Sequence, residues 1–170
     1  MPKLRTKSRR RNGYLGIDPG ASGGIVFLPG NLKGIEYYEM PVSEQDLWII
    51  IDSIAPSVEL ARVEYINPGM FGVHKSAAAK LYGSYMAVRM ALTAAGIPFE
   101  EVQPVKTWQT VGVAKRKKNE SANKWKDRLR AKAQQHFPKL DLWTKTKGLQ
   151  LKVADALLIA HACRKDNMRK

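Results

Sequence analysis

Short apolar runs separated by turn residues recur through the first part of the chain. Runs of this length bounded by Gly, Pro and Asn are typical of β-strands. The Pro-Gly-Ala-Ser-Gly segment at 19–23 predicts a tight turn between the first two runs. The pattern therefore predicts five strands, at residues 14–18, 24–28, 35–40, 60–66 and 98–102.

Two longer stretches have the three-to-four-residue spacing of an amphipathic helix. The first follows Ser43, a residue that suits a helix cap, and its apolar positions run from Leu47 to Ile54. The second covers 73–95 and stops at Gly96. Shorter helices are expected at 104–111, at 120–136 and at about 150–165.

The order of these elements predicts an α/β fold in which a mixed β-sheet is flanked by helices. The 170 residues suffice for one domain with one core, and no internal repeat divides them. We expect a basic N-terminal arm at 1–12, followed by a single domain at 13–170.

Charge is distributed unevenly along the chain, whose net charge is +14. Residues 1–11 carry six basic side chains, 12–105 are net acidic, and 106–147 hold thirteen basic residues against three acidic ones. Such asymmetry is typical of a protein that binds nucleic acid, because Lys and Arg displace counterions from phosphates. The alternative is a surface charged for solubility, which does not require so much self-repulsion.

Composition excludes several classes of protein. No apolar run approaches the roughly 20 residues of a membrane-spanning helix, so no membrane partner is expected. Cys163 is the only cysteine, which excludes an internal disulfide and a cysteine-based zinc site. We expect an intracellular protein, in the cytoplasm of a bacterial or phage-infected cell. The Arg-rich, acid-free N-terminal arm is also compatible with location in an organelle.

Three acidic residues stand alone in apolar segments. Asp18 ends the first strand, Glu64 lies near the end of the fourth, and Asp155 lies near the start of the last helix. Burying an unpaired charge is costly, so three such acids together favour a shared cation. Taken singly, each also suits a plainer role, as a turn residue or as a partner of the helix dipole.

In the order and spacing of these segments the chain resembles the RuvC-type Holliday junction resolvases. The resemblance implies an RNase H-like fold and a homodimer that nicks two opposed strands of a four-way DNA junction. It runs from about Tyr14 to Ala162. The matching residues are Gly16-Ile17-Asp18-Pro19-Gly20 with Gly23-Gly24-Ile25, then Val63-Glu64-Tyr65, and Ala154-Asp155-Ala156-Leu157-Leu158-Ile159-Ala160.

The resemblance also implies a metal-dependent reaction. Asp18 would bridge two Mg²⁺ or Mn²⁺ ions, with Glu64 and Asp155 holding one each, for a two-metal hydrolysis of the phosphodiester. Two symmetric nicks require two sites, which a two-fold homodimer supplies. The expected interface is the 73–95 helix, through Tyr82, Tyr85, Met86 and Met90.

Several basic residues are candidates for DNA contact, each with a solvated surface as the alternative. Lys106 and Lys124 match DNA-contacting lysines of the family, the first after Gln103-Pro104-Val105 and the second by counting back from Pro138. A basic run between Trp108 and Trp125 suits phosphate binding, and its tryptophans suit base stacking or the core. The run consists of Lys115, Arg116, Lys117 and Lys118.

Two positions depart from the family pattern. Lys152 stands where the family usually has a fourth acidic ligand, three residues before Asp155. Residues three apart share a helix face, so Lys152 is expected at the catalytic site, against a cation or on the scissile phosphate. The family's aromatic wedge is absent at Asn67. Met70 and Phe71 are the candidates to part stacked bases, with packing under the long helix as the alternative for Phe71.

Other functions fit parts of this pattern. Lys152 favours a pseudo-nuclease that binds junctions without cutting them. The three acids also fit another RNase H-like nuclease on branched DNA. An actin- or sugar-kinase-like ATPase begins with a similar Gly-Ile-Asp-x-Gly segment, but 170 residues do not hold its two domains. Cleavage assays on four-way junction, duplex and RNA–DNA hybrid would separate the nucleases.

Overall fold

The computed structural model describes residues 11–67, 69, 75–140, 142 and 153–168. The predictions for Met70, Phe71 and Lys152 fall outside these residues and stay predictions.

The centre of the fold is a five-stranded mixed sheet in the order β3-β2-β1-β4-β5. β1, β2 and β3 are antiparallel neighbours, whereas β4 and β5 run parallel to β1. The predicted α/β fold, a mixed sheet flanked by helices, is confirmed. The strands are β1 (Gly13–Asp18), β2 (Gly24–Pro29), β3 (Glu36–Glu39), β4 (Val58–Glu64) and β5 (Phe99–Val102).

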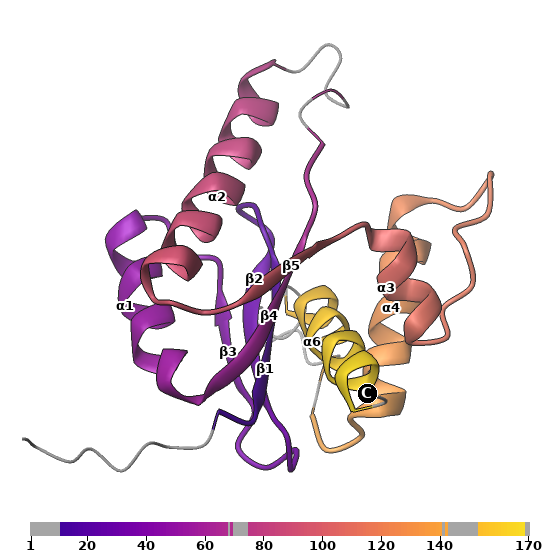
Figure 1. The fold of residues 1–170 in the computed structure, drawn as a ribbon. Helices are drawn as coiled ribbons and strands as arrows, with labels where there is room; N and C mark the ends of the chain where they lie inside the picture. The colour runs from indigo at the N-terminus through magenta and orange to yellow at the C-terminus, as the bar shows by residue number, and fades with distance from the viewer. Residues whose placement is uncertain (1–10, 68, 70–74, 141, 143–152, 169–170) are drawn as a thin grey trace, which may run out of the picture.

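Helices cover both faces of this sheet (Figure 1). One face carries α1 (Glu44–Ile54) and α2 (Lys75–Ala94), with the short 3₁₀ helix Ala55–Ser57 after α1. The other carries α3 (Pro104–Thr110), α4 (Ala122–His136) and α6 (Ala154–Asn167). Each face has its own apolar core, which explains why β1 and β2 read as continuous apolar runs.

Local signals account for the element boundaries. Ser43 caps α1 as predicted, because its hydroxyl accepts a hydrogen bond from the backbone N–H of Asp46. α2 is followed by Gly96 at φ +63°, a conformation that favours glycine. β4 begins at Val58, earlier than predicted, because that residue pairs with Gly13 of β1.

No helix in the described part of the chain is both long enough and apolar enough to span a membrane.

Candidate active site

The three acids predicted from the sequence line one open groove of about 1250 Å³. Asp18 is the last residue of β1, Glu64 is the last of β4, and Asp155 lies in the first turn of α6. Lys80 and Leu81 of α2 line the groove as well, together with residues of α3 and α4. The acids therefore lie where two sheet strands end, between the long helix and the α3–α4 pair.

Strand register brings two of the acids together. β1 and β4 are parallel neighbours in which Ile17 lies opposite Val63. The next residues along, Asp18 and Glu64, are therefore adjacent at the same edge of the sheet. This adjacency depends on the parallel pairing of strands that are far apart in sequence.

A glycine in β1 allows the third acid to approach. A Cβ on Gly16 would lie 2.1 Å from the carbonyl oxygen of Ala156 and 2.3 Å from the backbone nitrogen of Ala160. The backbone of α6 thus rests directly on β1, and this close packing brings the start of α6, with Asp155, to the end of β1. Gly23 makes a similar contact, because a Cβ there would lie 1.9 Å from the carbonyl oxygen of Asp18. The glycines of the motif therefore have a packing role beside the acid.

Burial and mutual repulsion disfavour ionisation of these carboxyls. Burial and the neighbouring Asp155 raise the pKa of Asp18 to about 7, against a partial lowering by Lys126. Burial, then Asp18 and Asp155, raise the pKa of Glu64 to about 8. Burial likewise raises the pKa of Asp155. Such shifts arise where like charges share a site of low dielectric, and a cation in the groove would relieve them.

The donor set suits a hard divalent cation. All three side chains offer carboxylate oxygens, and Mg²⁺ commonly uses one or two carboxylates while keeping several waters. Among the described residues, no group of three or more His, Cys, Asp or Glu side chains is arranged so that it could hold a metal ion as it stands. The carboxylate oxygens of the groove are thus of the ligand type that Mg²⁺ prefers, and the predicted binding of Mg²⁺ or Mn²⁺ stays a prediction.

A lysine that the sequence reasoning missed lies beside the acids. Lys126 Nζ is 3.6 Å from Asp155 Oδ2, and the ammonium lowers the pKa of all three carboxyls. Lys126 shares a helix face with Leu129 and Ala133, both buried. That spacing is the signal in the sequence that could have identified it.

Lys124, the lysine predicted to contact DNA, lies outside the groove, although it is only two residues from Lys126. It is exposed in the first turn of α4, where its backbone N–H donates to the capping Ser121 hydroxyl, and it does not line the groove. Of the two lysines, the structure therefore brings Lys126, and not Lys124, to the three acids.

Lys106 lies apart from the acids as well. It lines a separate pocket of about 540 Å³ with Arg62 and three acidic side chains. In that pocket the buried Arg62 forms ion pairs with Glu100 at 2.9 Å and Asp166 at 2.8 Å, which join β4, β5 and α6. Lys106 thus lines a pocket other than the acidic groove, and its predicted contact with DNA stays a prediction.

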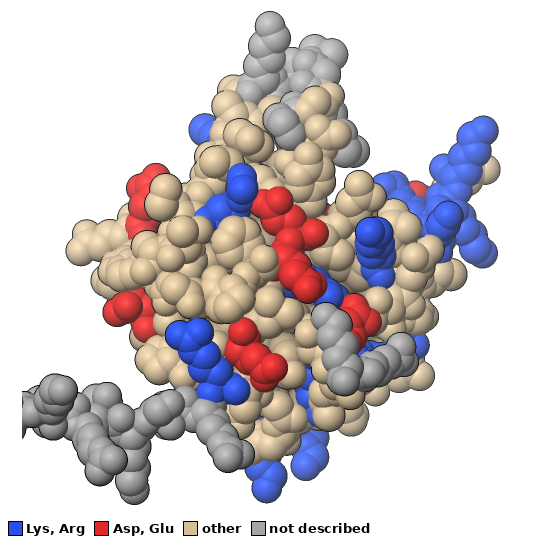
Figure 2. All heavy atoms as spheres, viewed as in Figure 1, with Lys and Arg blue, Asp and Glu red and all other residues tan. Residues whose placement is uncertain are grey.

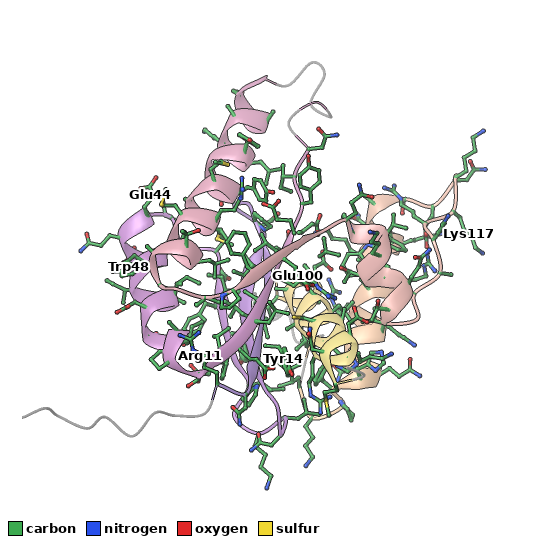
Figure 3. All side chains as sticks on the ribbon, in the orientation of Figure 1. Arg11, Tyr14, Glu44, Trp48, Glu100 and Lys117 are labelled. Atoms are coloured by element: carbon green, nitrogen blue, oxygen red, sulfur yellow. The ribbon has the colours of Figure 1, made fainter. Side chains whose placement is uncertain are left out.

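The predicted basic run occupies an exposed loop between α3 and α4. Lys115, Arg116, Lys117 and Lys118 are all exposed, and Figure 2 shows blue side chains gathered on the projecting loop. Lys117 points outward from this loop (Figure 3). Of the two flanking tryptophans, Trp108 is buried and Trp125 is half-buried.

Comparisons with known proteins agree with this architecture. No protein-family model and no curated protein matches the sequence. Among solved structures, RuvC of Thermus thermophilus in complex with a Holliday junction substrate has a TM-score of 0.58 and 19% identity, covering 92% of this chain and 96% of that one. A second structure of Thermus thermophilus RuvC has a TM-score of 0.57 at 19% identity, with the same coverage.

The yeast mitochondrial Holliday junction resolvase Ydc2 is similar too, with a TM-score of 0.56 and 14% identity over 91% of this chain and 78% of that one. At such low identity these matches establish architecture, and they confirm the fold implied by the sequence motifs. The chain has the RNase H-like fold of the RuvC-type Holliday junction resolvases.

Proposed function

We propose that the protein is a structure-selective endonuclease that nicks four-way DNA junctions by metal-dependent hydrolysis of a phosphodiester. The observation that carries the proposal is the groove in which Asp18, Glu64 and Asp155 meet from three separate elements. A fold shared with a RuvC solved in complex with a Holliday junction substrate supports the choice of substrate.

The carboxylates of Asp18, Glu64 and Asp155 would hold two Mg²⁺ or Mn²⁺ ions. When bound, the ions would supply Lewis-acid activation of the attacking water and stabilisation of the leaving oxygen. The two strand ends and the first turn of α6 fix the directions from which the three carboxylates approach. The protein's own task is therefore to keep like charges together on rigid elements.

Lys126 would act on the substrate side of the groove. Its side chain is 57% exposed, whereas that of Asp155 is 17% exposed, so the ammonium lies over the acids toward solvent. A phosphate that enters the groove would contact this ammonium, which can replace its ion pair with Asp155 by one with a phosphate oxygen. Lys126 would then hold the DNA backbone while the acids lie beneath it.

We further propose that two copies associate through α2. Met86 and Met90 are 41% and 68% exposed, as an interface requires. Tyr82 is half-buried in the chain's own core. Tyr85, predicted at the interface, is buried in that core, and its hydroxyl donates to Glu101. The predicted interface is corrected on this point, because a residue inside the protomer does not face a partner.

The proposal is tested with an aspartate variant and a matched control. Asp18→Asn should abolish cleavage of a four-way junction while leaving binding of the junction intact. Asp52→Asn makes the same change on the exposed surface of α1 and should cleave like the parent. Four-way junction, duplex and RNA–DNA hybrid are compared under Mg²⁺ and Mn²⁺. Unchanged cleavage by Asp18→Asn would place the chemistry elsewhere, and preference for the hybrid would indicate a different nuclease.

A junction binder that does not cut is the second candidate. The ammonium of Lys126 already supplies positive charge beside Asp155, a role that a metal ion would otherwise have. Tight junction binding by the parent protein, with no nicking under either metal, would favour this candidate over the nuclease.

A further inference from the structure

A third pocket, of about 320 Å³, lies on the other side of Trp108 and Trp125 from the acids. The two tryptophans line both the acidic groove and this pocket, so they form the wall between the two spaces. The centroids of the two indole rings are 6.4 Å apart, and the rings are arranged edge to face. Lys115 and Arg116 of the basic loop also line the pocket, and both are exposed at its rim.

The lining of this pocket combines three kinds of group. The half-buried indole of Trp125 offers flat aromatic surface, and Val105 and Val113 add apolar contact. Gln109 offers an amide that can both donate and accept hydrogen bonds. The rim carries positive charge. A nucleotide presents the matching groups, namely a flat aromatic face, a polar base edge and a phosphate.

Interactions within the protein hold this pocket in shape. The guanidinium of Arg128 lies 4.8 Å from the centre of the Trp125 ring. The same side chain donates to the carbonyl oxygens of Ala114 and Lys115 and pairs with the carboxylate of Glu120. One side chain thus joins the tryptophan to the loop that carries the basic rim. A preformed pocket binds with less loss of conformational entropy than one that must be assembled.

We infer that this pocket binds one nucleobase of the DNA strand that leaves the acidic groove, with the base stacked on Trp125 and its phosphate beside Lys115. The inference rests on the proposed function and extends it to recognition of an unstacked nucleotide. Bases beside a branch point lack a continuous duplex stack, so displacing one costs less than in regular duplex. Stacking accepts any base, and Gln109 is placed to favour some base edges over others.

An abasic scan tests the pocket. Four-way junctions are made with a single abasic site at successive positions on either side of the branch, and their dissociation constants are measured in EDTA. One position should weaken binding to the parent protein by about 5- to 150-fold, the range for loss of one base–aromatic stack. Trp125→Leu should bind the intact junction more weakly by a similar factor and be insensitive to the abasic site at that position.

Two further variants serve as matched controls. Trp48→Leu makes the same change on α1, which packs on the opposite face of the sheet, and should behave like the parent (Figure 3). Trp125→Phe keeps an aromatic ring and should retain part of the abasic effect. If Trp125→Leu fails to fold, 2-aminopurine at the sensitive position provides a readout in the parent protein, where stacking on an indole should quench its fluorescence.

The outcomes separate this inference from the proposed function. Because binding is measured without a divalent metal, the scan does not depend on cleavage. A Trp125-dependent abasic effect in a protein that never cuts would support the pocket and refute the nuclease. Cleavage with equal abasic profiles for the parent and Trp125→Leu, or with unquenched 2-aminopurine, would refute the pocket alone. Absence of any junction binding in EDTA would refute the pocket, and cleavage of the junction under Mg²⁺ or Mn²⁺ would decide the nuclease separately.

Discussion

Lys126→Gln changes the charge balance of the acidic groove without altering an acid. The parent ammonium lies 3.6 Å from Asp155 Oδ2 and lowers the pKa of Asp18, Glu64 and Asp155. A divalent cation that enters the groove must either displace this ammonium or lie beside it. We therefore expect the variant to bind Mg²⁺ more tightly than the parent protein.

The size of the effect follows from distance and exposure. Two unit charges 3.6 Å apart interact by about 4–5 kcal/mol at an effective dielectric of roughly 20. The Lys126 side chain is 57% exposed, and solvent screening reduces the interaction to about 1 kcal/mol. A change of that size corresponds to about a fivefold lower dissociation constant for Mg²⁺.

The assay is a calorimetric titration with Mg²⁺. It is done at a pH above the raised pKa values of about 7 for Asp18 and about 8 for Glu64, so that protons compete little with the metal for these carboxylates. Lys124→Gln is the control, because it removes the same charge from the same helix outside the groove. Weaker Mg²⁺ binding by Lys126→Gln would refute the reasoning and make Lys126 a support of the ligand geometry. Equal gains in both variants would indicate a long-range charge effect.

Three further predictions concern packing, assembly and pH. In a denaturant titration, Gly16→Ala should lower the free energy of unfolding by about 3 kcal/mol or more, because the added Cβ would overlap the backbone of α6. The control Gly83→Ala places its Cβ in open space on α2 and should be neutral or stabilising. Met90→Lys should shift the protein from dimer to monomer in light scattering, because it places a charge at a largely exposed apolar position of α2. A parent protein that is monomeric with and without junction DNA would contradict the proposed dimer. The pKa of His161 is lowered from 6.5 to about 4, first by burial and then by His136, Lys165 and Arg164. The unfolded state therefore takes up a proton that the folded state resists, so the free energy of unfolding decreases as pH falls from about 6.5 toward 4. His161→Phe should show a smaller loss than the parent across that window in unfolding experiments, and equal slopes for the two proteins would contradict the assignment.

Local information in the sequence was sufficient to predict most of the elements and the three acids. Each strand is a short apolar run between turn residues, and α1 has its capping Ser43. Asp18, Glu64 and Asp155 were recognisable because each is the lone acid of its predicted apolar segment, which is a property of neighbours in sequence. Gly16 also belonged to the motif, although its packing against α6 required the structure.

The partners of individual side chains depended on tertiary packing. Helical spacing shows that Lys126 shares a face with Leu129, but only the packing of α4 against α6 brings it to Asp155. Counting along the chain selected Lys124, which lies two residues away and therefore about 200° around the helix on another face, and its predicted contact with DNA stays a prediction. Contacts between residues distant in sequence depend on how helices and strands are packed, and a linear pattern of apolar positions determines only which face of each is buried.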